Sequence, residues 1–363
     1  MLTTKFDGFV LQNPLLPASG PLTGDVEKLL FLQESGCGAL VTKTISVASP
    51  HIPKPSIYGD KEFVFNSELW SEVDYQTWID EYLPALVKQK NRPLIVSVGY
   101  SKEDMAFLIP KLDPFADAFE ISTHYVGSDL SVIEAIVKTI RSHTAKPIYM
   151  KISPHIPSVE MFAKVIEQAG ANGIVAINSL GPSMKINVKS RSIEYASDHH
   201  FVWMSGPVIK PIALATVYRI KQACPNLTVI GVGGIKSAED VLEFILAGAD
   251  AVQMLSAALI KGKGLYKKII KDLLPTMELH GFHSMDEVKH ARLSQRLSYE
   301  GVVPTLVEED CIRCMLCKEV CPYYAISYSS KIEIDPLICA RCGLCVSKCP
   351  THALKGYYDE IKE

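Results

Sequence analysis

The chain has 363 residues, of which 48% are hydrophobic and 21% charged, and its formal net charge is −3. This length suits a large α/β domain followed by a small one, and the ordinary composition excludes disordered and fibrous proteins. The near-neutral charge predicts no nucleic-acid or membrane partner. The most apolar stretch, 241–260, is interrupted by polar residues, and the first residues do not resemble a signal peptide, so we expect a cytoplasmic protein.

Eight short apolar runs, each ending in small or polar residues, alternate with amphipathic stretches over the first part of the chain. The runs are 13–19, 38–44, 93–99, 118–123, 147–153, 173–179, 228–234 and 251–256. Such nearly continuous apolar runs are typical of parallel strands covered on both faces. Helical patterns lie between them, at 129–143, 159–169 and 238–247. Eight such units predict a (β/α)8 TIM barrel over residues 1–300, with a doubly wound open sheet as the alternative.

Two shorter segments complete this domain organisation. Residues 5–12 are expected to form a hairpin that closes the barrel floor. Residues 283–306 show a charged helical pattern that ends near Pro304, and a small α+β domain is predicted over 301–363. This second domain holds eight of the ten cysteines, whereas Cys37 and Cys224 lie in the barrel, where we expect them to be buried as small hydrophobic residues.

The cysteines of the second domain follow the bacterial ferredoxin spacing, Cys-x2-Cys-x2-Cys-x3-Cys-Pro, twice. This repeat predicts a ferredoxin-like domain with two [4Fe-4S] clusters, in which the fourth cysteine of each run binds the cluster of the other run. The ligand sets are then Cys311, Cys314, Cys317 and Cys349 for one cluster, and Cys339, Cys342, Cys345 and Cys321 for the other. Two structural zinc sites are the alternative, although zinc does not require the Cys-Pro endings.

Several polar residues follow the predicted barrel strands, at the end where barrel enzymes bind their ligands. Lys43 ends the second run and Lys151 lies inside the fifth, and a buried lysine is costly without an anion. The glycines at 231, 233 and 234 precede a predicted helix and form a candidate phosphate cradle, with a plain tight turn as the alternative. Lys236 stands where a dinucleotide-binding fingerprint requires glycine. These features predict an anionic cofactor such as FMN, without an NAD site.

The motifs along the barrel resemble those of one family. They are Ala18-Ser19, Val41-Thr42-Lys43-Thr44, Asn66-x-Glu68-Leu69-x-Ser71-Glu72, Lys151-x-Ser153-Pro154, Asn178, Ser205-Gly206-x-x-Ile209-Lys210-Pro211-Ile212-Ala213-Leu214, Gly233-Gly234-Ile235 and Ser256-Ala257. In these motifs the chain resembles the FMN-binding barrel of the dihydroorotate and dihydropyrimidine dehydrogenases. The resemblance covers nearly the whole chain and is greatest with the C-terminal half of dihydropyrimidine dehydrogenase.

The resemblance implies two overlapping sets of binding residues. The residues expected to contact FMN are Ala18, Ser19, Lys43, Thr44, Asn66, Lys151, Asn178, Gly206, Gly233, Gly234, Leu255 and Ser256. Those expected to contact the substrate are Asn66, Glu68, Ser122, Asn178 and Ser179. Amide side chains both donate and accept hydrogen bonds, which suits the N–H and C=O edge of a pyrimidine.

One segment departs from the family. Its members carry Asn-x-Ser-Cys-Pro after the fourth strand, where the cysteine, or a serine in some members, exchanges a proton with the substrate. Here Ser122 takes the place of the asparagine and Tyr125 that of the cysteine. Tyr125 is therefore the first candidate acid and His124 the second, unless Tyr125 only packs on the flavin. The missing amide favours a different or smaller unsaturated substrate.

The resemblance implies an FMN- and iron–sulfur-dependent oxidoreductase that acts on a CH–CH or C=C bond of a small unsaturated substrate. Without an NAD site, its electrons would be exchanged with a ferredoxin or with an NAD(P)H-oxidising flavoprotein subunit. An electron-transfer subunit that has no substrate chemistry of its own is the alternative. A homo-oligomer is compatible with all of these features.

Overall fold

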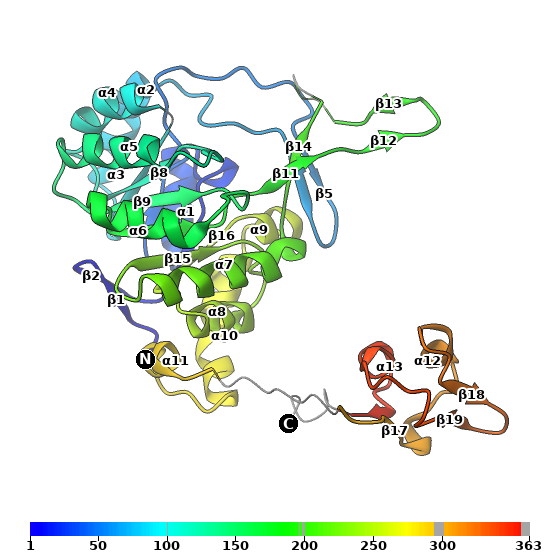
Figure 1. The fold of residues 1–363 in the computed structure, drawn as a ribbon. Helices are drawn as coiled ribbons and strands as arrows, with labels where there is room; N and C mark the ends of the chain where they lie inside the picture. Colours follow the sequence, from blue (N-terminus) through cyan, green and yellow to red (C-terminus); the bar gives the residue numbers. More distant parts are fainter. Residues whose placement is uncertain (100, 196, 198–199, 294–300, 357–363) are drawn as a thin grey trace. The chain divides into compact units, whose positions relative to one another are not determined.

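A computed structural model describes all residues except 100, 196, 198–199, 294–300 and 357–363 (Figure 1). The chain forms two compact units, Met1–Leu293 and Ser294–Glu363, which are described separately. The boundary predicted between residues 300 and 301 lies seven residues beyond this division. Among the described residues, no helix is long and apolar enough to cross a membrane.

The first unit is built on eight parallel strands, and each corresponds to one of the predicted runs. They are β3 (Leu15–Pro17), β4 (Leu40–Val41), β7 (Leu94–Val98), β8 (Ala118–Ser122), β9 (Ile148–Ile152), β10 (Gly173–Ala176), β15 (Thr228–Val232) and β16 (Ala251–Met254). Their order is β3-β16-β15-β10-β9-β8-β7-β4. The two outer strands also meet, because the Gly38 amide donates a hydrogen bond of 2.9 Å to the Leu15 carbonyl. The barrel prediction is therefore confirmed, and the open-sheet alternative is wrong.

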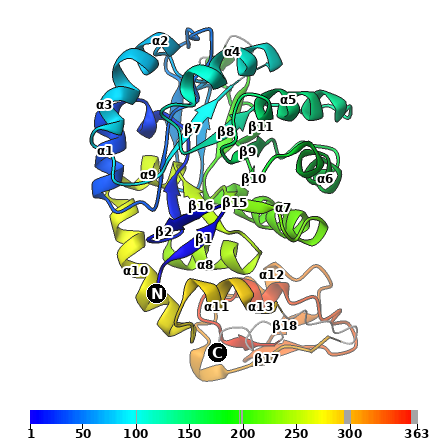
Figure 2. The same ribbon diagram turned by 90° about the vertical axis from the view of Figure 1, so that its left-hand side faces the viewer.

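Helices surround these strands on the outside of the barrel (Figure 2). They are α1 (Val26–Glu34), α2 (Tyr75–Thr77), α3 (Leu83–Val87), α4 (Lys102–Leu112), α5 (Ser131–Arg141), α6 (Val159–Ala169), α7 (Lys210–Ala223), α8 (Ala238–Leu246), α9 (Ser256–Lys261), α10 (Leu265–Leu279) and α11 (Met285–His290). The three predicted helices correspond to α5, α6 and α8. Helix α6 shows why the prediction succeeds: the Ser158 hydroxyl accepts a hydrogen bond from the Met161 amide at its start, and Gly170 ends it in the left-handed conformation.

The core lies between the strands and helices and inside the barrel itself. Cys37 and Cys224 are buried in it as expected, and burial raises the pKa of their thiols to about 12 and about 11. The predicted hairpin is formed by β1 (Thr4–Phe6) and β2 (Phe9–Leu11). Its side chains pack with the residues that fill the barrel interior, and the Thr4 hydroxyl bonds to the Asp250 carbonyl just before β16. The hairpin therefore closes the N-terminal end of the barrel.

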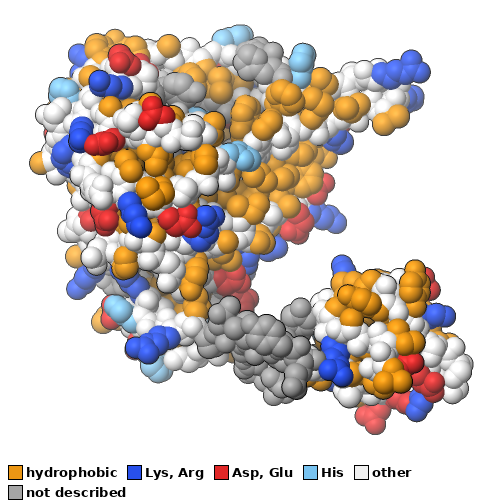
Figure 3. Space-filling model, in the orientation of Figure 1, with side chains coloured by type: hydrophobic (Ala, Val, Ile, Leu, Met, Phe, Trp, Pro, Cys, Tyr) orange, Lys and Arg blue, Asp and Glu red, His pale blue; other side chains and the backbone are white. Residues whose placement is uncertain are grey.

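A second sheet, absent from the sequence-based prediction, is formed by segments that follow β4 and β10. We call it the cover sheet; its order is β11 (Leu180–Ser183), β14 (Val202–Ser205), β6 (Val64–Asn66) and β5 (Ile57–Gly59). A hairpin of β12 (Ile186–Asn187) and β13 (Ser192–Ile193) projects from it (Figure 1). Hydrophobic side chains gather on this part of the surface (Figure 3), and Val188 at the hairpin tip is 86% exposed.

The charged stretch 283–306 is predicted as one helical segment, and the structure differs from this prediction. Among the described residues of this stretch, α11 is the only helix, and Ala291 after it has the extended backbone angles φ −65° and ψ 136°. Residues 294–300 lie outside the described part. The second unit contains β17 (Thr305–Leu306), α12 (Leu316–Glu319), β18 (Ile326–Tyr328), β19 (Ile332–Ile334), α13 (Leu344–Lys348) and β20 (Leu354–Lys355). Strand β17 pairs with β20, and β18 pairs with β19.

The two halves of this unit repeat in backbone conformation as well as in sequence. Arg313 and Arg341 occupy equivalent places and both have a positive φ, of 54° and 58°. Tyr324 and His352 form a second equivalent pair, each with φ 54°. Because residues other than glycine seldom adopt this conformation, its recurrence at matching positions indicates that each half follows the same chain path.

Candidate functional site

A pocket lies at the C-terminal ends of the barrel strands, beneath the cover sheet. It is lined by sixteen of the seventeen barrel residues that the sequence suggested, and Tyr125 is the exception. The sixteen are Ala18, Ser19, Lys43, Thr44, Asn66, Glu68, Ser122, His124, Lys151, Asn178, Ser179, Gly206, Gly233, Gly234, Leu255 and Ser256. Residues far apart in the chain therefore converge on one cavity, as expected for the top of a barrel.

Lys43 follows β4 and forms an ion pair at the pocket wall. Its Nζ lies 2.7 Å from Glu68 Oε2, and only 7% of Lys43 is exposed. Glu68 also accepts a hydrogen bond from the Ser56 hydroxyl and lies 3.6 Å from Lys54 Nζ. Burial alone would raise the pKa of Glu68, but Lys43, Ser56 and Lys54 outweigh it and hold that pKa below its usual value. Glu68 is therefore ionised at neutral pH.

Lys151 has a partner that the sequence analysis missed. Its Nζ lies 3.1 Å from Oε1 of Glu120 on β8, and the other oxygen of Glu120 accepts a 2.6 Å hydrogen bond from Gln253 on β16. Glu120 and Gln253 are fully buried and Lys151 is 8% exposed. The expectation that both lysines need an external anion is therefore corrected, because a carboxylate of the chain itself pairs with each. The sequence holds one indication of this partner, because Glu120 is the only acidic residue in the apolar run 118–123.

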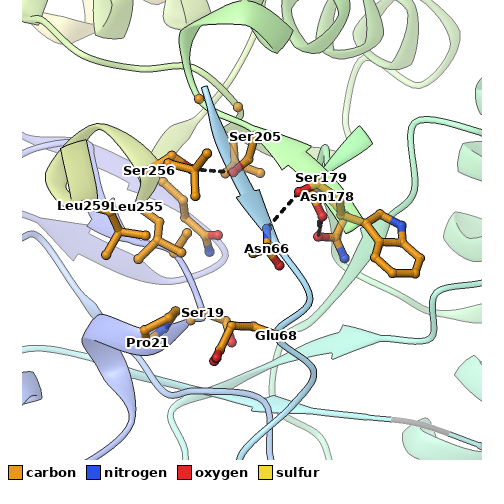
Figure 4. A pocket seen from close by; sticks show the side chains of 18 of the residues that line it. Ser19, Pro21, Asn66, Glu68, Asn178, Ser179, Ser205, Leu255, Ser256 and Leu259 are labelled. Carbon is orange, nitrogen blue, oxygen red and sulfur yellow. Dashed lines mark hydrogen bonds between the residues drawn. The ribbon is translucent and has the colours of Figure 1, made fainter. Parts of the chain in front are cut away.

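Amide, hydroxyl and carboxylate side chains surround the pocket beside the cover sheet (Figure 4). Asn66 at the end of β6 points into the cavity, with Ser205 and Ser256 to one side, Asn178 to the other and Glu68 below. The Asn66 amide donates a 3.3 Å hydrogen bond to the Trp203 carbonyl on β14, which fixes its direction. Asn178 Oδ1 accepts a 2.8 Å hydrogen bond from the amide of Ser179. The pocket therefore offers both donors and acceptors to a flat polar ligand.

Two glycines let chain segments approach closely beside the pocket, where β14 and β15 end. Gly206 and Gly234 both have a positive φ, of 101° and 88°. A Cβ at Gly206 would lie 3.1 Å from the Phe63 backbone, and one at Gly234 would lie 2.7 Å from Lys210 Cβ. Ser256 donates a 2.8 Å hydrogen bond to Ser205 beside them. This glycine-rich cradle and the two buried lysines fit the phosphate and the ring of FMN.

His124 and Tyr125 follow β8 but differ in position. The Tyr125 hydroxyl donates a 2.5 Å hydrogen bond to the Asp129 carbonyl, and Tyr125 does not line the pocket. The Tyr125 hydroxyl, predicted as the first candidate acid, is therefore not directed into the pocket. His124 lines the pocket at its exposed mouth, with φ 52°. The surrounding protein and the charge of Lys151 lower the pKa of His124 below its ordinary value, so its imidazole is neutral at pH 7.

The eight cysteines of the second unit surround two separate cavities. Cys349 lines the first cavity with the cysteines of the first run, Cys311, Cys314 and Cys317. Cys321 lines the second cavity with the cysteines of the second run, Cys339, Cys342 and Cys345. Among the described residues, no three His, Cys, Asp or Glu side chains form a site for a single metal ion.

The chain matches known proteins over both units. Residues 1–277 match the family described as Dihydroorotate dehydrogenase, and residues 310–353 match the 4Fe-4S dicluster domain. The chain is 30% identical to a Dihydroorotate dehydrogenase B (NAD(+)), catalytic subunit, from Pyrococcus horikoshii over 304 residues, which cover 79% of this chain and 96% of that protein. The subunit of the same description from Methanothermobacter thermautotrophicus is 31% identical over 301 residues, or 79% and 97% of the two chains.

A relative with a different description has a similar identity. Dihydroorotate dehydrogenase A (fumarate) from Lactobacillus helveticus is 32% identical over 299 residues, which cover 77% of this chain and 95% of that protein. The family match extends over most of the chain and includes the whole pocket. The chain therefore belongs to the dihydroorotate dehydrogenase family of FMN-dependent oxidoreductases, and it carries a 4Fe-4S domain.

Proposed function

We propose that the protein oxidises or reduces a CH–CH/C=C bond in a small uncharged cyclic amide, such as a dihydropyrimidine, with FMN bound in the barrel pocket. The observation that carries this proposal is the pairing of both pocket lysines with carboxylates. Asn66, Glu68 and Asn178 surround the remaining space with donors and acceptors. An electron relay without a substrate has no need of this polar arrangement above a flavin.

The charges of the pocket favour an uncharged substrate over a carboxylate such as dihydroorotate. Among the described residues that line it, Lys43 and Lys151 are the only lysines and there is no arginine. The Lys43 charge is offset by Glu68, and that of Lys151 by Glu120. An anionic substrate would meet the ionised Glu68 without an unpaired cation, and a buried like-charge contact is costly. An N–H group of an uncharged amide, in contrast, could donate to Glu68.

Different pocket residues have different roles in the proposed reaction. FMN, when bound, exchanges a hydride with the substrate carbon. Lys43, Lys151 and the Gly206–Gly234 cradle would hold the cofactor, and Asn66 and Asn178 would orient the substrate. His124, neutral at pH 7, would take the proton from the neighbouring carbon during oxidation, and its protonated form would return the proton during reduction.

We further propose that the second unit holds two [4Fe-4S] clusters with crossed ligation. The two cavities support this proposal, because each contains three cysteines of one run and the fourth of the other. Clusters transfer single electrons, so the partner would be a ferredoxin or an NAD(P)H-oxidising flavoprotein subunit. The description of two relatives as catalytic subunits favours the second type of partner.

The proposed substrate class can be tested on the purified protein. We expect the anaerobically photoreduced flavin to be reoxidised by uracil or thymine at least about tenfold faster than by orotate, because of Glu68. Absorbance of the flavin during rapid mixing measures these rates. Faster reoxidation by orotate would contradict the charge argument. Reaction with none of the three compounds, together with normal electron transfer through the clusters, would favour the electron-transfer subunit.

Replacing Lys43 by methionine is expected to weaken FMN binding by roughly 10–100-fold and to lower the flavin reduction potential. The variant removes a nearly buried positive charge from the pocket wall, and a hydrogen bond to a charged group is worth about that factor. Fluorescence titration and a potentiometric titration measure the two effects. Lys54→Met is the matched control, since Lys54 also neighbours Glu68 but does not line the pocket. Equal effects of the two variants would remove Lys43 from the site.

A further inference from the structure

Gln253 carries an unsatisfied acceptor at the bottom of the pocket. It lies on β16, is fully buried, and lines the pocket. Its Nε2 donates to Glu120, whereas its Oε1 has no hydrogen-bond partner among the described residues. A buried carbonyl oxygen without a partner costs free energy, so this oxygen is suited to a donor that arrives with a ligand.

Glu120 fixes which atom of Gln253 is offered to the ligand. A carboxylate only accepts hydrogen bonds, so the amide nitrogen of Gln253 must face Glu120 and the oxygen must face away. The other oxygen of Glu120 holds the ammonium of Lys151 at 3.1 Å. In the sheet order, β8 and β16 are separated by β9, β10 and β15, so the hydrogen bond between Gln253 and Glu120 crosses the barrel interior. One buried carboxylate therefore sets the position of a donor and of an acceptor.

We propose that Glu120 is a positioning residue for the flavin ring, acting through Lys151 and Gln253. The inference rests on the proposed binding of FMN in this pocket. The oxidised ring has a single N–H, at N3, between two carbonyl groups. Gln253 Oε1 accepts from this N–H, while the Lys151 ammonium donates to an acceptor of the ring. Gln253 on β16 and Lys151 on β9 are both buried among the barrel strands, whereas Asn66 on β6 of the cover sheet is only half-buried, and we assign the two barrel groups to the cofactor.

The full-length protein, depleted of FMN with its clusters retained, tests this proposal by comparing FMN with 3-methyl-FMN. Methylation removes the N–H and leaves Gln253 Oε1 without a donor, so the wild type should bind the methylated cofactor about tenfold or more weakly. Gln253→Met keeps a similar volume without the acceptor and should bind both forms within about threefold. Gln76→Met, at an exposed glutamine of α2, is the matched control and should keep the wild-type discrimination.

Glu120→Gln separates positioning from a merely structural role. An amide at residue 120 can face Gln253 with either atom, so Gln253 is no longer fixed and the discrimination should fall below about threefold. Discrimination that persists in Gln253→Met or in Glu120→Gln would overturn the inference, and so would equal binding of both cofactors by the wild type, which requires no variant to fold. A wild type that binds neither cofactor would instead contradict the proposed function.

Discussion

The reaction of the flavin with substrate is expected to slow by about 10²–10⁴-fold when His124 is replaced by glutamine, which is the usual contribution of a positioned acid or base. His124 lines the pocket and its lowered pKa keeps it neutral at pH 7, as a base requires. Glutamine retains a polar side chain but cannot take up the proton. Anaerobic rapid mixing of the oxidised flavoprotein with the dihydro form of its substrate measures this rate.

Tyr125→Phe is the matched control for the neighbouring residue. Its rate should stay within about twofold of wild type, because the Tyr125 hydroxyl already donates to the Asp129 carbonyl outside the pocket lining. The wild-type rate of oxidation should rise with pH through the lowered pKa of His124 and level off above it, and His124→Gln should lose this step. Loss of turnover in Tyr125→Phe alone would return the acid–base role to the tyrosine.

Replacing Cys321 by serine should remove about half of the roughly eight iron atoms expected for two cubane clusters per chain. The cluster that is lost should be the one between Cys339, Cys342 and Cys345, since Cys321 lines the same cavity as these three. Electron transfer from the partner to the flavin should fall with it. Iron assays and electron paramagnetic resonance of the reduced protein measure the loss.

Two reference variants identify which cluster disappears. The resonance spectrum of Cys321→Ser should coincide with that of Cys342→Ser and differ from that of Cys314→Ser, because Cys314 lines the other cavity. Cys224→Ser, in the barrel core, should retain all of the iron. A Cys321→Ser spectrum that matches Cys314→Ser would show that each run of cysteines binds its own cluster.

Local pattern was sufficient to predict the barrel, because each strand and helix carries its own signal. The apolar run 118–123 became β8, and the stretch 129–143 became α5 with its isoleucines buried. The partner of Lys151 could not be predicted in this way, since Glu120 and Gln253 meet only after the barrel has closed. Their contact depends on strand order and register, which single-strand patterns do not specify.

Irregular segments limited the prediction of the site. The cover sheet forms from short strands such as Val64–Asn66, whose pairing with β14 joins residues more than a hundred positions apart. Tyr125 is predicted as an acid because it takes the place of a family cysteine, but the local turn directs its hydroxyl to the Asp129 carbonyl. The sequence after α11 keeps the charged character of the predicted helical stretch, but the backbone becomes extended at Ala291.

The separation between barrel wall and cover sheet has a consequence for how the proposed site tolerates substitution. Under the proposed function, Lys43, Lys151 and Gly234 at the ends of barrel strands hold the cofactor, and a substitution there would disturb cofactor binding and the fold together. Asn66 and Trp203 belong to short strands outside the barrel, so changes there leave the eight-stranded frame intact. In the proposed site, substitutions in the outer sheet would therefore alter the choice of substrate while the lysines of the barrel strands stay in place.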